Sequence, residues 1–377
     1  MLKYRIFNRI DDVPGDLWDG LIKERSRTFS HAFWSLIEAS KLNDFEYRYV
    51  IFYAENDIAI GAATFYAVTT DIAIFAPRPL RRLLDMARRF IPGLLKLRML
   101  ECGTPIILNS PPWLCADQTC AEEMQRCLLA LLERVAREEG YWLIVVRDFE
   151  PGSEQEQREM VAAGFHLIDG LPNTYLDLPW HDAEAYQAAM KSYYRSKLQK
   201  YLKRNRAAGI SHELVDEFSE LAPKLAAQWL VVHEQAQEFQ REVLNAEFYR
   251  QLSLRQDIAV KAILYFRNGE LVGHALLMLD GDLGRWLYFG RELAANDGLY
   301  LYVAYSVVQT AIECGVNRLE LGLTTYPIKQ DLGARLTPIQ FAIKASSRIL
   351  NPFVGWGYRL LNKPARLSQR AVFRKPD

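Results

Sequence analysis

The chain repeats one order of structural signals in its two halves, and this repetition limits the folds open to it. Residues 47–68 predict a β-hairpin with a turn at Glu55-Asn56-Asp57. Residues 260–279 predict a second hairpin with a turn at Arg267-Asn268-Gly269. Later in each half, a long helical pattern ends at a glycine and leads into a short apolar strand. The chain therefore reads as two copies of one α/β unit.

The helix, glycine and strand signals set the correspondence between the copies. Residues 120–139 form the helical pattern before Gly140, and residues 300–314 form the one before Gly315. We expect two units, each a twisted mixed sheet flanked by helices, that match at these glycines and at Gly61 and Gly273.

Length and composition support two domains. With 377 residues, 50% of them hydrophobic, the chain can bury two cores. We expect an N-terminal unit over residues 1–180 and a C-terminal unit over 181–345 that begins with a basic helix at 183–208. A basic, aromatic tail follows over 346–377. The first unit is longer between its matching glycines, which predicts an inserted basic amphipathic helix near residues 77–99.

Three basic segments indicate an anionic partner. Residues 191–206 hold seven cations and no acid, opposite an apolar stripe of Tyr194, Leu198, Tyr201 and Leu202. In the insertion, the expected apolar face is Leu80, Leu83, Leu84 and Ala87. In the tail, Pro352, Gly355 and Gly357 predict that no single helix runs through it. The helix at 191–206 either pairs with acids elsewhere in the fold or faces a phosphate, a nucleic acid or a lipid surface. The insertion either packs on its own core or lies on an anionic membrane surface. The tail binds anionic lipid or RNA, or frays.

Charge, cysteines and missing motifs exclude several classes. The net charge is zero, with excess acid in the first half and excess base in the second, which excludes a dedicated duplex-DNA binder. The five cysteines form no C-x-x-C pair, so no metal site is expected and a reducing compartment fits best. No secretory or membrane-spanning pattern occurs, so we expect a cytoplasmic protein, with the inner face of the membrane as a candidate place of association. Phosphate-binding, hydrolase and metalloprotease motifs are missing from the sequence, and no tightly bound cofactor is expected.

A run near the end of the second copy carries a family resemblance. Residues 313–333 read Glu-Cys-Gly-Val-Asn-Arg-Leu-Glu-Leu-Gly-Leu-Thr-Thr-Tyr-Pro-Ile-Lys-Gln-Asp-Leu-Gly, and Tyr288-Phe289-Gly290 precedes them. Together with the basic helix, this resembles the FemAB-like and BioF2-like (Acetyltransf_6) acyltransferases of the GNAT superfamily. The resemblance covers residues 180–345 by motif and the first half by pattern. It implies tandem GNAT units, as the repetition does independently.

Candidate catalytic residues lie in and before this run. Thr324 or Thr325 can cap the next helix, and Lys329 then projects from its first turn beside the strand's carboxyl end, where an oxyanion or phosphate would bind. The resemblance implies that Tyr326 protonates a leaving thiolate. Glu320 is a candidate base or ion-pair partner of Lys329, and His274 is a candidate base. Each has a structural alternative: solvent exposure for Lys329, helix capping for Tyr326 and core packing for His274.

The donor-binding prediction rests on two regions. GNAT enzymes read the CoA pyrophosphate through [R/Q]-x-x-G-x-[G/A], and residues 291–298 lack this pattern. The amides of Asn296 and Gly298, with Thr324 and Thr325, are the substitute candidates, and the helix would add Arg195, Lys197 and Lys200.

Three functions remain open at this stage. The first is an N-acyltransferase that uses an acyl-CoA or similar donor and an amine acceptor. The second is a FemAB-type aminoacyltransferase that uses aminoacyl-tRNA and acts on a cell-wall or lipid precursor. The third is an inactive GNAT-like scaffold that binds anionic lipid or RNA.

Overall fold

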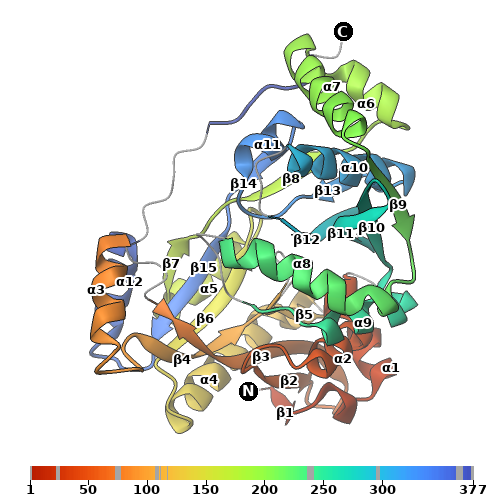
Figure 1. The fold of residues 1–377 in the computed structure, drawn as a ribbon. Coiled ribbons are helices and arrows are strands. Elements are labelled where there is room, and N and C mark those ends of the chain that lie inside the picture. Colours follow the sequence, from red (N-terminus) through yellow and green to blue (C-terminus); the bar gives the residue numbers. More distant parts are fainter. Residues whose placement is uncertain are drawn as a thin grey trace. The chain divides into compact units, whose positions relative to one another are not determined.

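The computed structural model describes residues 2–22, 26–72, 78–106, 110, 112–116, 118–235, 242–293, 298–361 and 368–374. They belong to two compact units (Figure 1). The first consists of Met1–Leu171 with Pro338–Arg366, and the second of Pro172–Thr337 with Leu367–Asp377.

Each unit is built on one mixed sheet. The first sheet has the order β1-β2-β3-β4-β6-β15-β7, and β5 pairs with β3 outside this path. Its strands are β1 (Lys3–Phe7), β2 (Glu46–Tyr53), β3 (Ala59–Asp71), β4 (Lys96–Cys102), β5 (Trp113–Cys115), β6 (Leu143–Phe149), β7 (His166–Asp169) and β15 (Gln340–Ala345). The second sheet has the order β14-β8-β13-β12-β11-β10-β9. Its strands are β8 (Asn173–Asp177), β9 (Ile210–Val215), β10 (Val260–Arg267), β11 (Glu270–Asp280), β12 (Leu283–Arg291), β13 (Arg318–Glu320) and β14 (Arg335–Thr337).

Helices flank both sheets. The first unit contains α1 (Gly15–Ile22), α2 (His31–Ser40), α3 (Arg78–Ala87), α4 (Ala121–Glu138), α5 (Glu154–Ala162) and α12 (Asn351–Leu361). The second contains α6 (Ala183–Ala189), α7 (Ser192–Ala207), α8 (Ala222–Gln235), α9 (Ala246–Leu254), α10 (Leu299–Glu313) and α11 (Tyr326–Asp331). Short 3₁₀ turns lie at Ile10–Asp12, Arg27–Phe29, Gln118–Cys120, Ser219–Leu221 and Gln256–Ile258.

The two sheets have the same topology, which confirms the predicted duplication. Read from β1 and from β9, their strands correspond one for one, and the parallel pair β4 and β6 matches the parallel pair β12 and β13. Gly61 and Gly273 occupy equivalent places, because each pairs directly beside a register shift in its hairpin. Gly140 and Gly315 follow α4 and α10 with φ of 75° and 74°, the left-handed conformation that a glycine adopts at a helix end.

The units exchange strands, so their boundaries differ from those expected. β8 comes before residue 180 but lies in the second sheet, between β13 and β14. β15 comes before residue 345 but lies in the first sheet, between β6 and β7. The predicted boundaries at residues 180 and 345 therefore assigned β8 to the first unit and β15 to the second, whereas β8 belongs to the second sheet and β15 to the first. The tail is also divided, because α12 belongs to the first unit and residues 367–377 to the second.

The core of the second unit is formed around α10 and the apolar side of α7. Helix α10 is apolar on nearly every face, and such a helix is stable only when it is surrounded. Leu198 and Leu202 of α7 are buried in the same cluster, with Tyr194 and Tyr201 packed against it. The predicted apolar stripe of α7 is therefore the face that docks.

The insertion and the tail each contribute one helix to the first unit. Helix α12 is continuous through Pro352, Gly355 and Gly357, contrary to the prediction. Pro352 lies in the first turn, where an N–H has no helical partner to lose, and a Cβ on Gly355 would lie 2.9 Å from the His166 ring. No helix in the described part of the chain is long and apolar enough to cross a membrane.

Candidate active site

The candidate site lies where β12 and β13 separate. These parallel strands pair only from Leu283 with Arg318 to Arg285 with Glu320. β12 then continues to Arg291, whereas the next residue after β13, Leu321, donates its N–H to Thr174 of β8 at 2.8 Å. The β13 chain therefore turns toward β8, and the two carboxyl ends diverge. Ligands of α/β proteins bind outside the carboxyl ends of strands at such points.

The turn that follows β13 has an unusual backbone. Thr324 and Thr325 both have positive φ, of 60° and 49°, a region that β-branched residues rarely adopt. Thr325 occupies the N-cap position of α11 but makes no side-chain capping hydrogen bond. Its side chain is instead hydrogen bonded to Tyr300 of α10. The expected capping role is therefore replaced by a link to α10, and the strained turn marks this segment as a functional candidate.

Lys329 of α11 is buried in this turn. Its side chain is 2% exposed, and its Nζ donates to the Leu323 carbonyl at 2.5 Å. Burial lowers the pKa of Lys329 to about 7, and the Glu320 carboxylate opposes this shift in part. An amine with this pKa changes its charge near neutral pH, as acid–base and anion-stabilising groups of active sites do. Solvent exposure, the structural alternative for Lys329, is excluded by its burial.

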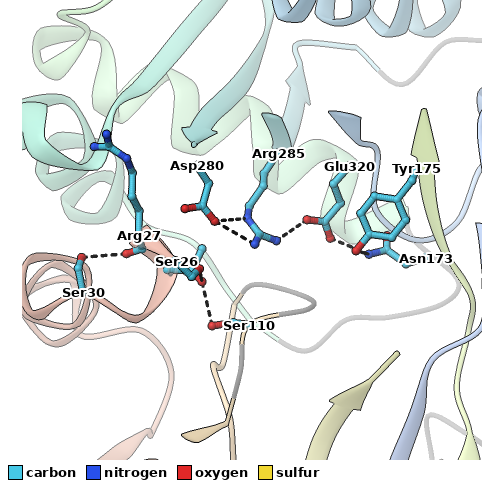
Figure 2. Close-up of polar contacts among 10 residues, drawn as sticks. Ser26, Arg27, Ser30, Ser110, Asn173, Tyr175, Asp280, Arg285 and Glu320 are labelled. Atoms are coloured by element: carbon cyan, nitrogen blue, oxygen red, sulfur yellow. Dashed lines mark hydrogen bonds and ion pairs between the residues drawn. The ribbon is translucent and has the colours of Figure 1, made fainter. Parts of the chain in front are cut away.

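Glu320 belongs to a buried chain of polar side chains (Figure 2). Its carboxylate accepts from Arg285 Nη1 at 2.5 Å and from Asn173 Nδ2 at 2.7 Å. Arg285 also donates through Nε to Asp280 at 3.0 Å, and Asn173 also donates to the Tyr175 hydroxyl at 3.0 Å. Because both Glu320 oxygens hold donors, the carboxylate does not fit a general base. The expected ion pair with Lys329 is wrong, since Glu320 pairs with Arg285.

Tyr326, the first residue of α11, is buried as well. Its hydroxyl donates to the Pro172 carbonyl at 2.9 Å and so links α11 to the start of β8. To deliver a proton elsewhere, the phenol would have to leave this bond.

His274 is a core residue. Its side chain is fully buried, with Nδ1 2.9 Å from Gln228 Oε1 and Nε2 3.0 Å from the Tyr249 hydroxyl. The amide oxygen only accepts, so Nδ1 carries the proton and Nε2 accepts from Tyr249. Burial lowers the pKa of His274 to about 3, and the ring stays neutral at physiological pH. The prediction that His274 acts as a general base is therefore not supported.

Two of the predicted donor-binding residues, Asn296 and Gly298, come just before α10 in the sequence. Asn296 lies outside the described residues. Gly298 has a φ of 81° at the N-cap of α10, where a Cβ would lie 2.7 Å from the Tyr201 ring of α7. Helix α7 therefore packs directly against the turn that opens α10, and Asn205 Nδ2 adds a bond to the Gly298 carbonyl at 3.3 Å.

The cations of α7 also differ in their surroundings. Lys197 is paired with Asp331 of α11 at 2.6 Å, and Asp331 is also bound by Arg370. Arg195 lines a groove of about 430 Å³ with Arg206 and Tyr305. Lys200 is exposed and forms no ion pair among the described residues. Lys197 therefore anchors the helix, and Arg195 and Lys200 remain the candidates for an anionic ligand.

Sequence reasoning missed the partners that hold the site. Arg285, Asp280, Asn173 and Asp331 were not predicted, although each is paired and all but the partly buried Asp280 are buried. Asn173 and Glu320 are 147 residues apart, and no local pattern joins them. The available signal was Arg285, a charged residue at a central strand position among apolar neighbours.

Comparisons with known proteins identify the fold. Residues 192–330 match Acetyltransf_6, the acetyltransferase (GNAT) domain. Two proteins named "Putative 8-amino-7-oxononanoate synthase 2", from Mycobacterium tuberculosis strains CDC 1551 / Oshkosh and ATCC 25618 / H37Rv, are 26% identical over 322 residues. These matches cover 82% of this chain and 41% of the relatives, so the chain spans about two fifths of their length.

Three solved structures share the architecture. FemX matches with a TM-score of 0.56 and 12% identity over 90% of this chain and 96% of its own. A tandem GNAT protein from the clavulanic acid biosynthesis pathway matches with 0.56 and 13% over 92% and 99%. The C-terminal domain of a putative lysylphosphatidylglycerol synthetase from Agrobacterium fabrum matches with 0.54 and 12% over 94% and 98%. The match to the Acetyltransf_6 (GNAT) domain at residues 192–330 confirms the resemblance for that part of the chain, and the solved structures show that the fold of the chain is similar to those of FemX and of a tandem GNAT protein.

Proposed function

We propose that the second unit is an N-acyltransferase that moves an acyl group from acyl-CoA to an amine. The observation that carries the proposal is Lys329, an amine of pKa about 7 buried at the point where β12 and β13 diverge. The GNAT match spans α7 to α11 and therefore includes this residue. The description of the matched domain, an acetyltransferase (GNAT) domain, supports an acyl donor and does not fix the acyl group.

In the proposed reaction, the main task of the site is to stabilise the oxyanion that forms on the acyl group. The acceptor nitrogen attacks the acyl carbonyl carbon, and the carbonyl electron pair moves to oxygen, which becomes an oxyanion. Lys329 Nζ donates to this oxyanion in place of the Leu323 carbonyl, and the developing negative charge favours its ammonium form. Collapse of the intermediate then breaks the acyl–sulfur bond, and the proton lost by the amine neutralises the thiolate. Tyr326 is the candidate carrier of that proton, once it leaves the Pro172 carbonyl.

The proposed donor site lies at the start of α10. Phosphates bind at the amino-terminal ends of helices, and Gly298 brings the chain at the start of this 15-residue helix close to α7. Thr324 and Thr325, with Asn296 and Gly298, remain the proposed contacts of the donor. Both acyl-CoA and aminoacyl-tRNA are made in the cytoplasm, so we propose that the reaction takes place there.

Two substitutions test the assignment. Lys329→Ala should lower turnover at saturating substrates by about two orders of magnitude, the worth of one oxyanion contact of roughly 3 kcal/mol. Lys200→Ala, on the exposed face of α7, should raise the KM for the donor in a salt-dependent way and leave turnover unchanged. Release of free thiol from a panel of acyl-CoAs with amine acceptors is the measurement. Wild-type turnover in Lys329→Ala would refute the site.

A second candidate function is aminoacyl transfer from tRNA. It is favoured by α7, where Lys200, Lys203, Arg204 and Arg206 are exposed and form no ion pairs within the described part of the chain. Stabilisation by charged tRNA but not by acyl-CoA, measured as a shift of the thermal midpoint, would select this function. Stabilisation by neither, with no turnover, would leave the inactive scaffold.

A further inference from the structure

At one end of its strands, which we call the edge, the first sheet gathers more than half of the exposed large hydrophobic residues that the structure describes. The register places four strand ends there. Asp71 at the end of β3 pairs with Lys96 at the start of β4. Leu143 at the start of β6 pairs with both Met99 of β4 and Ala345 at the end of β15. The chain leaves this edge twice, once into α3 and once into α12, which are separated by more than 250 residues in sequence.

The segments that contain α3 and α12, and the strand ends beside them, expose large apolar side chains. More than half of the exposed large hydrophobic residues of the described chain lie here, namely Leu83, Met86, Phe90, Ile91, Trp142, Ile349, Leu350, Phe353 and Trp356, which we call the edge patch. Phe90 is 87% exposed and Trp356 67%. Leu83 and Met86 are three residues apart in α3 and so lie on one face of the helix, and Phe90 follows in the turn after it. Apolar clusters of this kind on a protein surface are interaction sites.

The segments that carry the edge patch are packed against the first unit through other side chains. Val354 and Tyr358 of α12 pack on a small core cluster under the sheet, and Ile72 and Leu97, which flank the α3 segment, pack on the same cluster. Arg88 closes the base of the segment through Asp71 at 2.7 Å and the Leu94 carbonyl at 3.0 Å. Leu84 and Ala87 are half-buried, so α3 turns one side inward and Leu83 outward. The exposed residues are therefore the outer faces of docked elements.

The charge around the edge patch selects its partner. Arg82, Arg89, Lys96 and Arg348 are exposed, and none forms an ion pair among the residues that the structure describes. In sequence, residues 78–98 contain seven cations and only Asp85 as an acid, and residues 346–374 contain no acid. Exposed aromatic and aliphatic side chains ringed by unpaired cations are the pattern of proteins that lie on an anionic bilayer. A neutral protein partner would gain nothing from the cations.

We propose that the edge patch binds the surface of a membrane that contains anionic lipid, with α3 and α12 lying at the headgroup level. Phe90, Ile91, Phe353 and Trp356 would enter the interface, and Arg82 and Arg89 would meet the phosphates. This surface belongs to the first unit and goes beyond the proposed transfer reaction, which is assigned to the second.

Cosedimentation with vesicles tests the proposal. The full chain should bind vesicles of phosphatidylcholine mixed with phosphatidylglycerol, should bind pure phosphatidylcholine far less, and should be released by salt. Arg82→Gln with Arg89→Gln should weaken binding more than tenfold, since each cation near such a surface is worth about fivefold. The matched control is Lys200→Gln with Lys203→Gln on α7, which should bind as the wild type does.

The apolar contribution has its own matched pair. Ile91 and Ile58 are 57% and 60% exposed, but Ile58 lies in the β2–β3 turn, at the opposite end of β3. Ile91→Ser and Trp356→Ser should each weaken binding several-fold, whereas Ile58→Ser should not. Circular dichroism of each variant checks that the fold is kept.

Three outcomes would overturn the proposal. Equal binding to both lipid mixtures would show that the cations have no role. Loss of binding only in the α7 variant would place the anionic surface there. A mass in light scattering that doubles with concentration in the wild type, and not in Trp356→Ser, would show that a second copy of the chain covers the patch. Transfer activity on soluble substrates should be the same in all edge-patch variants.

Discussion

At the scale of single residues, Lys329 couples function to stability through its burial. The pKa of Lys329 in the folded chain is about 7, below its value near 10.4 in an unfolded chain. Below pH 7 both states hold the proton, and the full cost of burying the charge is present. Between pH 7 and 10.4 only the unfolded state holds it, so this cost declines as the pH rises.

Lys329→Met tests this coupling. The variant should be more stable than the wild type at pH 6, by on the order of 4 kcal/mol at most, and the difference should shrink toward pH 10. Turnover should fall at every pH. Urea unfolding at a series of pH values measures the difference, and an offset that does not change with pH would show that the amine is not buried as described.

His274 makes a contribution of the same sign at lower pH. Its pKa is about 3 in the folded chain, below the unfolded value of 6.5, so only the unfolded state takes up a proton between these values. Stability should therefore be lost as the pH falls from 6.5 toward 3, by about 1.4 kcal/mol per pH unit from this group. His274→Gln should be less stable at neutral pH, because two buried partners lose the ring, but its stability should decline less in acid. Equal acid dependence of the two proteins would contradict the assignment.

At the scale of elements, one buried chain of charges joins three strands. Arg285 of β12, Glu320 of β13 and Asn173 of β8 are bonded in series, and β8 is the strand that the first half of the sequence supplies. Glu320→Gln would take the negative charge from beside the Arg285 guanidinium, which would keep Asp280, and would place an amide NH2 against one of the two donors, Arg285 or Asn173. The expected loss is roughly 3–5 kcal/mol of unfolding free energy, as for other broken buried pairs.

Strands β8 and β13 also carry an exposed ion pair, which serves as the control. Asp177 of β8 lies 3.6 Å from Arg318 of β13, and both side chains are close to half exposed or more. Asp177→Asn should cost less than about 1 kcal/mol, because solvent screens the pair. Chemical denaturation of both variants measures the contrast, and equal losses would show that burial is not the cause.

The elements also show which features a single sequence can predict. The two hairpins, the helices that end at Gly140 and Gly315 and the apolar stripe of α7 were predicted, because turns, helix ends and periodic apolar residues are local signals. The strand exchange was not, because β8 and β15 follow their neighbours along the chain with no break in composition. Lys329 lies in α11, after the turn that follows β13, and its burial depends on how α11 docks, which no local pattern records. For His274 the prediction was a general base, because histidine often has that role, but the side chain is buried and hydrogen bonded in the core and has a structural role.

At the scale of the whole molecule, the reciprocal strand exchange makes each unit depend on a distant part of the chain. The second sheet is complete only with β8, since β13 and β14 both pair with that strand and not with each other. A fragment that begins at residue 181 would leave β13 with one open edge and would remove the strand with which β14 pairs. It would also remove Asn173 and Tyr175 from the buried chain of Glu320 and Arg285, and Pro172 from the Tyr326 hydroxyl.

Two fragments that differ only in this strand test that dependence. Residues 172–337 should fold with a cooperative thermal transition and give dispersed NMR signals, although Val372 and Phe373 are lost from the core. Residues 181–337 should show no cooperative transition, because unpaired strand edges would remain and the buried Glu320 carboxylate would lose its Asn173 donor. Adding a synthetic peptide of residues 171–180 should restore structure to the shorter fragment if β8 pairs as described. Cooperative folding of 181–337 without the peptide would mean that β8 adds no essential part to the second sheet.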